Sequence, residues 1–360
     1  MSFGIALLGA GVFAKREHLP AIKACQSFSL KAVYSRSQSS AESFVAVACE
    51  GEANEDVEAY FDSPSTPSKS LDDLLRRDDI VAVIVAVAID VAPELIKKAL
   101  AAGKHVLSEK PIAPDLNTAR SLVNYSQQLK DVLWGVGENF RFWNSVHRAA
   151  EIIKDLDANL LTFSVTAYSF TDAKNPFYHS DWRQNPTFQG GYLLDGGVHF
   201  VAVLRILLAA IGRTIDSASA YTMSLQKDLP PVDTIHAILR TDNGRSGSYI
   251  SSVGMEAKLG MEFEIVTDKG SIAYLPFQKQ ILTKLKYQQE KGKWEDKTEP
   301  APLMWGVKEE VAAFAESISA GRLDSKLSSS EALEDLRVVE AMLKSAEAEG
   351  QPIYLARDTV

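Results

Sequence analysis

The first part of the chain alternates short apolar runs with segments whose apolar residues recur at helical spacing. Residues 3–8 read FGIALL, and residues 12–25 then carry apolar side chains three and four positions apart. The same order returns in FSLKAVYS and AESFVAVACE, in DDIVAVIVAVA and PELIKKALAAG, and finally in KHVLSE. Runs rich in β-branched residues are typical of strands buried on both faces of a parallel sheet. The pattern predicts an α/β domain with a doubly wound parallel sheet.

The pattern changes after about residue 130. Strand-like segments separated by turn residues follow one another there, among them LLTFSVTAYSF, TIHAILRT, GRSGSYISSV and MEFEIVTDKGSIAYL. Alternation and glycine-containing turns favour a mainly antiparallel sheet. Two amphipathic helical segments close the chain, and they are candidates to pack back on the first domain. We therefore predict a dinucleotide-binding domain over residues 1–130 and an α+β domain for substrate binding and oligomerisation over residues 131–360.

Composition narrows the class of protein. A length of 360 residues suits two domains, and the net charge of −9 provides no basic surface for nucleic acid. Cys25 and Cys49 have no metal-ligand spacing, no metal site is visible, and two cysteines cannot form a disulfide framework. The apolar runs are shorter than the roughly 20 residues of a membrane span, and no signal peptide is apparent. The sequence predicts a soluble, cytoplasmic protein that binds neither nucleic acid nor membrane.

A glycine fingerprint lies between the first predicted strand and the first predicted helix. It reads Gly9-x-Gly11-x-x-Ala14. Gly9 suits a turn with positive φ, Gly11 allows a pyrophosphate to approach the backbone, and Ala14 lets the helix pack on the strand. The alternative is a glycine turn without a ligand. In this context the motif predicts a dinucleotide whose diphosphate lies at the helix N-terminus.

The end of the second strand suggests which dinucleotide binds. Sites that prefer NAD usually place Asp or Glu there, whereas this chain reads VYSRSQSS. Ser35, Arg36 and Ser37 offer a guanidinium and two hydroxyls, which suit a 2′-phosphate. An exposed loop arginine without a ligand is the alternative. We predict NADP in preference to NAD.

Two further segments carry candidate chemistry. GKHVLSEKPIA places Glu109, Lys110 and Pro111 directly after a strand, at the sheet edge where open α/β folds bind ligands. GGYLLDGGVHFV, residues 190–201, places Asp195 and His199 at helical spacing behind paired glycines. Alone, this second segment is equally consistent with the glycine-marked start of a core helix.

LLGAGVFA, EKP and DGGVH together resemble the Gfo/Idh/MocA family of nicotinamide-dependent oxidoreductases, which includes glucose-fructose oxidoreductase and inositol dehydrogenase. The resemblance covers nearly the whole chain. It implies an N-terminal Rossmann fold, a C-terminal α+β domain with a large open sheet, and an active site between the two. It also implies a cis Lys110–Pro111 peptide. Because the family often uses the open sheet for oligomer contacts, we expect a homodimer or a higher homo-oligomer.

The resemblance implies that Lys110, Asp195 and His199 surround the reacting carbon. The imidazole of His199 suits proton transfer to or from a substrate hydroxyl, and Lys110 would stabilise alkoxide character on the same oxygen. Asp195 would bind a substrate hydroxyl or orient the ring. In some family members the lysine has been viewed as the base, so the resemblance leaves open whether Lys110 or His199 transfers the proton. The predicted cofactor-binding residues are Gly9, Gly11, Val12, Phe13, Ser35, Arg36, Ser37, Ala86, Glu109 and Lys110.

Candidate substrate-binding residues occur in two further segments, ENFRF and HSDWRQNP. They are Asn139, Arg141, Trp182 and Arg183. The chain departs from the family pattern at Ala202, where an aspartate is common, and in AVAIDVA, where the usual TP...H is missing. Histidines outside the motif are more often structural than functional, and His18 in HLPA is the best candidate among them. The others are His105, His147, His179 and His236.

The sequence predicts an NADP-dependent oxidoreductase that acts on CH–OH donors. It would transfer hydride between nicotinamide and a C–OH or C=O of a small substrate, such as a sugar, a polyol or a related carbonyl compound. One alternative is a non-catalytic NAD(P)-binding transcriptional regulator of the same fold. Another is a trans-dihydrodiol dehydrogenase or a biliverdin-type reductase. Retention of both Lys110 and His199 argues against the regulator.

Overall fold

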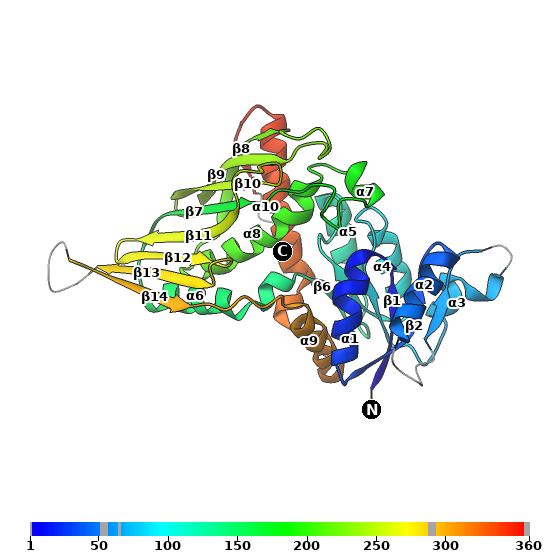
Figure 1. Ribbon diagram of the computed structural model, residues 1–360. Coiled ribbons are helices and arrows are strands. Elements are labelled where there is room, and N and C mark those ends of the chain that lie inside the picture. Colours follow the sequence, from blue (N-terminus) through cyan, green and yellow to red (C-terminus); the bar gives the residue numbers. More distant parts are fainter. Residues whose placement is uncertain (1, 51–56, 64–65, 287–292, 356–360) are drawn as a thin grey trace. The chain divides into compact units, whose positions relative to one another are not determined.

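The computed structural model describes residues 2–50, 57–63, 66–286 and 293–355 (Figure 1). The chain forms two compact units, each assembled from two segments. The first unit comprises Met1–Phe142 and Gly306–Leu333, and the second comprises Trp143–Trp305 and Glu334–Val360. The sequence analysis placed a boundary at residue 130, but the first sheet continues beyond it. Strand β6 (Trp134–Gly137) pairs with β5 (His105–Glu109) and belongs to the first unit.

The first unit contains a parallel sheet of six strands in the order β3-β2-β1-β4-β5-β6. The strands not yet given are β1 (Phe3–Leu8), β2 (Phe28–Tyr34), β3 (Glu58–Tyr60) and β4 (Ala82–Val85). β4 is buried along its whole length, as its run of apolar residues predicts. The strand order reverses between β1 and β4, which is the topology of a doubly wound Rossmann sheet. The predicted fold class is confirmed for this unit.

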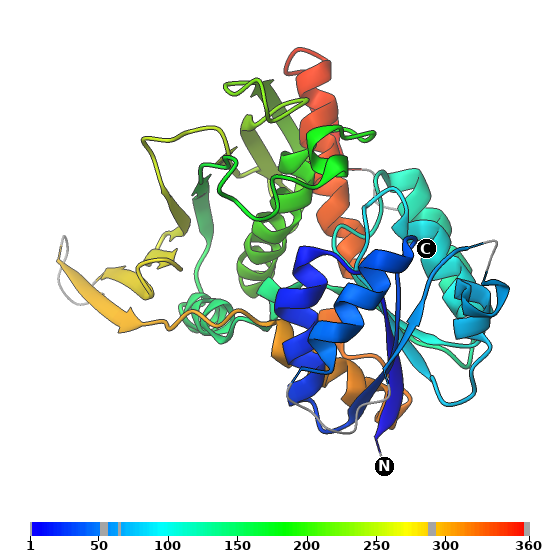
Figure 2. The ribbon, with the colours of Figure 1, turned by 45° about the vertical axis from the view of Figure 1, so that its right-hand side comes forward.

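Helices cover both faces of the first sheet (Figure 2). Those on one face share an apolar cluster with β1, to which Phe44, Val311 and Phe314 contribute fully buried side chains. Val311 and Phe314 belong to α9, which comes from the C-terminal part of the chain. The helices of this unit are η1 (Ala14–His18), α1 (Leu19–Ala24), α2 (Gln38–Ala48), η2 (Pro67–Lys69), α3 (Leu71–Leu75), α4 (Ala92–Ala101), α5 (Leu116–Gln127), η3 (Asn139–Phe142), α9 (Val307–Ala320) and η4 (Ser325–Leu327).

The second unit contains a sheet of nine strands in the order β14-β13-β12-β11-β7-β10-β9-β8-β15. β7 and β10 pair in parallel, and the other neighbours pair antiparallel. The large, mainly antiparallel sheet that we predicted is therefore confirmed. The strands are β7 (Leu160–Tyr168), β8 (Ile215–Met223), β9 (Thr234–Thr241), β10 (Ser246–Ser252), β11 (Gly260–Thr267), β12 (Gly270–Leu275), β13 (Gln280–Lys286), β14 (Trp294–Pro300) and β15 (Ile353–Tyr354).

One face of this sheet is packed and the other is open. In β9, Ile235, Ala237 and Leu239 are buried, whereas His236 and Ile238 between them are exposed. Alternate residues of a strand point to opposite faces of the sheet, which explains this alternation of buried and exposed side chains. Helices occupy the packed face (Figure 1). The helices whose bounds are not yet given are α6 (Asn144–Asp155), α7 (Asp181–Gln184), α8 (Tyr192–Ala210) and α10 (Ser329–Glu347).

α8 is the one helix in the described part of the chain whose length and apolar composition would suffice to cross a membrane. In this fold it contacts α6 and the strands β7, β10 and β11 of its own unit. Of its most apolar window, 61% is buried inside the protein. Burial in the core of the unit accounts for the high hydropathy of this helix.

Candidate functional site

The fingerprint turn after β1 has the geometry that a dinucleotide requires. Gly9 adopts a φ of 122°, and a Cβ there would lie 2.1 Å from the carbonyl oxygen of Ala86. A Cβ on Gly11 would meet nothing within 4 Å, so the backbone leaves open space at the start of the helix. Ala14 is buried, as helix packing demands. The turn therefore fits a diphosphate beside Gly11, Val12 and Phe13.

The segment after β2 is arranged around the start of α2. The Ser35 N–H donates to the Tyr60 carbonyl over 3.1 Å, and the Ser37 hydroxyl caps α2 by accepting from the Ser40 N–H over 3.3 Å. Arg36 between them is exposed. A guanidinium beside a helix N-terminus provides both a charge and free N–H groups for a phosphate.

The sequence analysis found no acid at the end of β2, yet the structure places one beside it. Asp62, which follows β3, accepts a hydrogen bond of 2.5 Å from the Tyr34 hydroxyl. Burial and this bond raise the pKa of Tyr34 well above its ordinary value, and nearby Arg36 opposes the rise. Inspection of β2 alone missed Asp62, because the acid comes from the neighbouring strand.

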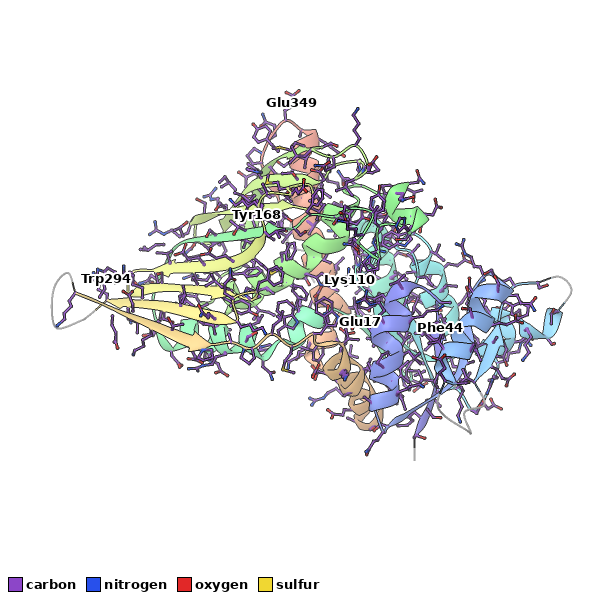
Figure 3. The ribbon with its side chains drawn as sticks, in the orientation of Figure 1. Glu17, Phe44, Lys110, Tyr168, Trp294 and Glu349 are labelled. Carbon is purple, nitrogen blue, oxygen red and sulfur yellow. The ribbon has the colours of Figure 1, made fainter. Side chains whose placement is uncertain are left out.

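The EKP segment lies at the carboxyl end of β5, and the Lys110–Pro111 peptide is cis, as predicted. Lys110, labelled in Figure 3, is partly buried. His18 is buried on the π-helical turn η1, and its Nε2 lies 2.6 Å from Glu109 Oε1. Because an ionised carboxylate only accepts, Nε2 carries the hydrogen of this bond. His18 thus reaches the EKP segment through Glu109.

A buried carboxyl group that the sequence analysis did not select lies close to EKP. Glu310 on α9 is 1% exposed, and neither carboxyl oxygen has a hydrogen-bond partner among the described residues. A Cβ on Gly137, at the end of β6, would lie 2.8 Å from Glu310 Oε1. The sequence did contain a signal, since Val307, Glu310, Val311 and Phe314 share helical spacing and so one face of α9.

Burial determines the ionisation of Glu310. Desolvation first, and then the charges of Glu109 and Glu138, raise its pKa well above 4.5, while Lys110 opposes the rise. The first turn of α9 favours a negative charge by about 0.3–1 kcal/mol, whereas burying an unpaired carboxylate costs several kcal/mol. Desolvation is the larger effect, so burial favours the protonated form of Glu310.

In the second unit, Asp195 is paired with Arg183. Arg183 Nε donates to Asp195 Oδ2 over 2.8 Å, and the guanidinium lies 3.9 Å from the Trp182 ring centroid. Asp195 is buried in the first turn of α8, and His199 follows one turn later, partly buried. The contact places a guanidinium beside the Asp195 carboxyl group and gives Arg183 a partner in the protein. Asp195 and Arg183 therefore form one pair beside Trp182.

The glycines around this helix start serve different purposes. Gly190 and Gly191 have φ of 83° and 48°, and Gly191 is the N-cap of α8. A Cβ on Gly191 would lie 2.4 Å from the Pro230 carbonyl oxygen, whereas one on Gly196 would meet nothing within 4 Å. The turn and the packing therefore require glycine at positions 190 and 191.

The remaining predicted residues have varied surroundings. Asn139 and Arg141 are buried in η3 of the first unit, and Arg141 Nη1 lies 3.7 Å from Glu331 Oε2. Ala202, where the family often has aspartate, is fully buried in the second unit. His105 Nδ1 accepts from the Leu133 N–H over 3.0 Å, which is a structural role.

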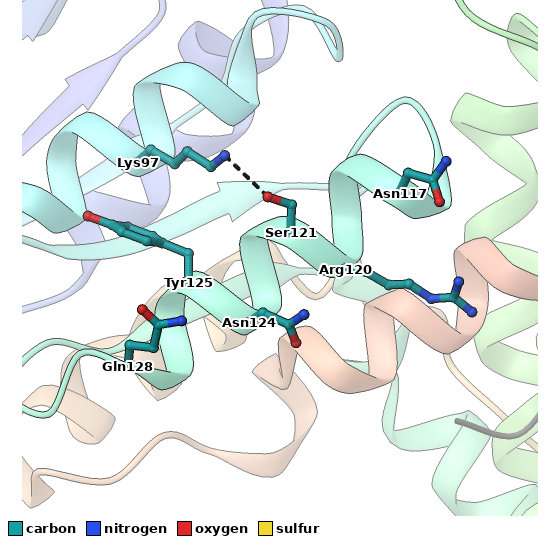
Figure 4. Close-up of a pocket in the computed structure, with 7 residues that line it drawn as sticks. All are labelled: Lys97, Asn117, Arg120, Ser121, Asn124, Tyr125 and Gln128. Carbon is teal, nitrogen blue, oxygen red and sulfur yellow. Dashed lines mark hydrogen bonds between the residues drawn. The ribbon is translucent and has the colours of Figure 1, made fainter. Parts of the chain in front are cut away.

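A surface hollow of about 720 Å³ lies on α4 and α5 of the first unit (Figure 4). Lys97 Nζ donates to Ser121 Oγ there over 3.4 Å. The lining residues are Lys97, Asn117, Arg120, Ser121, Asn124, Tyr125 and Gln128. None of them was a predicted site residue. Within the described ranges, no group of three or more His, Cys, Asp and Glu residues is arranged to hold a metal ion.

Family models match both parts of the chain. Residues 3–137 match the model for the oxidoreductase family with an NAD-binding Rossmann fold, and residues 159–355 match its C-terminal alpha/beta domain. These two ranges together account for most of the chain.

Individual proteins give the same result. A dehydrogenase named FPY6 from Fusarium mangiferae is 43% identical over 350 residues, which cover 96% of this chain and 97% of that protein. A dTDP-3,4-didehydro-2,6-dideoxy-alpha-D-glucose 3-reductase from Streptomyces antibioticus is 28% identical, covering 76% of this chain and 74% of that protein. The crystal structure of an oxidoreductase from Thermotoga maritima matches with a TM-score of 0.83 and 28% identity over 99% of both chains. The chain belongs to the Gfo/Idh/MocA family of oxidoreductases.

Proposed function

We propose that this oxidoreductase uses NADP(H) to transfer hydride between nicotinamide and a C–OH or C=O group of a small sugar, polyol or related carbonyl compound. The observation that carries the proposal is that Lys110 lies at the same sheet edge as the open Gly9–Gly11 turn. The name of the Streptomyces relative supports a sugar ketone as the substrate class.

Three side chains have separate roles in the proposed reaction. The cofactor, when bound, supplies the hydride chemistry. Lys110 donates a hydrogen bond to the substrate oxygen and stabilises negative charge on it, while His199 transfers the proton. Asp195, held by Arg183 at 2.8 Å, accepts from a substrate hydroxyl with its remaining acceptor capacity.

A substrate screen tests this function. Oxidation of NADPH and reduction of NADP⁺ are followed with sugars, polyols, diols and small aldehydes. We expect turnover with at least one polyhydroxylated carbonyl compound. Tight cofactor binding without any turnover would contradict the proposal and favour the regulator. Turnover confined to diols without a sugar framework would favour a trans-dihydrodiol dehydrogenase.

Arg36→Ala tests the choice of NADP. Loss of a charge-assisted contact to the 2′-phosphate is expected to weaken NADP⁺ binding by about 10- to 100-fold and to leave NAD⁺ binding nearly unchanged. Titration calorimetry with both nucleotides measures the two Kd values. Arg76→Ala is the matched control, because Arg76 is a 72% exposed arginine of the same unit that pairs with Asp73. An unchanged ratio of the two Kd values in Arg36→Ala would show that Arg36 does not select NADP.

We also propose that the chain forms a homo-oligomer through the open face of the second sheet. Tyr221, Ile238 and Ile250 lie on that face in neighbouring strands, and Ile238 is 54% exposed. Exposed apolar side chains grouped in this way are typical of interfaces. Ile238→Lys is expected to lower the mass measured by sedimentation to that of one chain. An unchanged mass, with Lys297→Ala as the surface control, would exclude this face.

For its location, we propose the cytoplasm. Cys25 and Cys49 are not joined in a disulfide, which suits a reducing compartment. Microscopy of a tagged chain checks the location directly.

A further inference from the structure

Four ionisable side chains of the first unit come together around the EKP segment. Glu109 and Lys110 follow β5, Glu138 follows β6, and Glu310 projects from the buried face of α9. Glu138 accepts from the Phe140 N–H over 3.1 Å, and Glu109 is bonded to His18. Glu310 differs from both, because neither of its oxygens has a partner among the described residues.

Packing alone does not account for an acid at position 310. Val307, Val311 and Phe314 are the apolar neighbours of Glu310 on the buried side of this helix, and an apolar side chain at 310 would avoid the desolvation of a carboxyl group. Instead, the carboxyl group lies against the backbone of Gly137 and within electrostatic reach of Lys110. Buried ionisable groups of this kind concentrate where their charge is used.

We propose that Glu310 is a positioning residue that keeps its proton at neutral pH, and that it thereby sets the charge around Lys110 and the relative affinity for oxidised and reduced nicotinamide. This inference rests on the proposed function. With Glu310 neutral, Glu109, Glu138 and Lys110 sum to one negative charge, and ionisation of Glu310 makes it two. His18 on η1 contacts this cluster through Glu109, whereas Lys308 and Glu309 on α9 are exposed.

The strand order indicates which half of the cofactor is affected. Each half of a doubly wound sheet binds one mononucleotide, and the two halves meet at the reversal between β1 and β4. Arg36 follows β2 in one half, so the nicotinamide half belongs over the ends of β4, β5 and β6. These are the ends that carry Lys110 and Glu138. The oxidised ring is positively charged and the reduced ring is neutral, so an added negative charge there favours the oxidised form.

The test compares the Kd of NADP⁺ and NADPH between about pH 6 and about pH 10 in the wild type and Glu310→Gln. In the wild type, the ratio Kd(NADP⁺)/Kd(NADPH) is expected to fall about fivefold as Glu310 loses its proton. Gln resembles the neutral acid. The ratio Kd(NADP⁺)/Kd(NADPH) of Glu310→Gln should therefore equal that of the wild type at neutral pH and remain unchanged as the pH rises. The two proteins differ only at position 310, so a difference between their pH profiles originates from that substitution.

Glu309→Gln is the matched control. It removes a carboxylate from the neighbouring position of the same helix, where the side chain is exposed, and its ratio should follow the wild type. Identical pH profiles for the wild type and Glu310→Gln would overturn the inference. So would a ratio in Glu310→Gln that already differs from the wild type at neutral pH. If the wild type binds neither nucleotide, the proposed function fails instead, which separates the two failures.

Folding stability gives an independent readout that needs no cofactor. The folded pKa of Glu310 is raised, so its stabilising contribution is complete below 4.5 and is lost as the pH rises through the folded value. Glu310→Gln has no such loss. The free energy of unfolding of this variant, relative to that of the wild type, should therefore increase as the pH rises. If the variant does not fold, the infrared band of a protonated carboxyl group in the wild type replaces this test. Absence of that band at neutral pH would overturn the inference.

Discussion

Lys110→Ala is expected to lower kcat by about 10²- to 10⁴-fold while it changes the Kd of NADPH by little. Removal of the ammonium takes away the hydrogen bond to the substrate oxygen in the state where that oxygen carries most charge. We expect binding of the dinucleotide to depend chiefly on the Gly9–Gly11 turn, which this substitution leaves intact. Single-turnover absorbance of NADPH measures the chemical step, with a substrate taken from the screen.

Two comparisons make the lysine prediction specific. Lys98→Ala removes an exposed lysine of the same unit, which pairs with Glu94, and should retain wild-type turnover. Small primary amines added to Lys110→Ala should restore part of the lost rate, because they can occupy the space of the side chain. Wild-type kcat in Lys110→Ala would remove Lys110 from the mechanism.

His199→Ala tells which residue transfers the proton. If His199 is the acid or base, its loss removes the limb of the pH–rate profile that reflects an imidazole, and Lys110→Ala retains that limb. If Lys110 transfers the proton, Lys110→Ala loses a limb of the profile and His199→Ala retains it. The comparison decides a question that the sequence left open.

Gly191→Ala is expected to lower the free energy of unfolding by more than about 3 kcal/mol. Its φ of 48° and ψ of −121° lie outside the regions that alanine populates, and the new Cβ would come 2.4 Å from the Pro230 carbonyl oxygen. A backbone atom cannot move aside as a flexible side chain can. Urea denaturation followed by circular dichroism measures the loss.

Gly196→Ala is the matched control in the same segment. Gly196 lies inside α8, and a Cβ there meets nothing within 4 Å. Alanine is a better helix former than glycine by about 1 kcal/mol, so Gly196→Ala should be neutral or more stable than the wild type. Equal stabilities of the two variants would show that the turn before α8 does not require glycine.

The local sequence pattern was sufficient to predict features that depend on residues close together in the chain. The cis Lys110–Pro111 peptide was expected from the family resemblance alone. The turn at Gly9 and Gly11 and the spacing of Asp195 and His199 on one helix could be predicted from the residues themselves. Each feature is determined within a few residues, where backbone sterics and helical periodicity act. The alternation of strands and helices likewise predicted the parallel sheet.

Pairings between distant residues could not be predicted in this way. Arg183 was proposed as a substrate ligand, and its bond to Asp195 depends on how the segment before α8 folds back. Asp62 lies beside Tyr34 because β3 adjoins β2, and Glu310 lies near Glu109 because α9 packs on the first sheet. In all three cases, tertiary packing decides the partner.

The late position of α9 has a consequence for how the protein is made. Val311 and Phe314 fill the same apolar cluster as Ile5 and Leu7, although some 300 residues separate them along the chain. Domains generally fold in order as they leave the ribosome. Here the unit that begins first cannot complete its core until α9 has been synthesised. We therefore expect the nascent chain to expose part of an apolar sheet face until α9 has been synthesised.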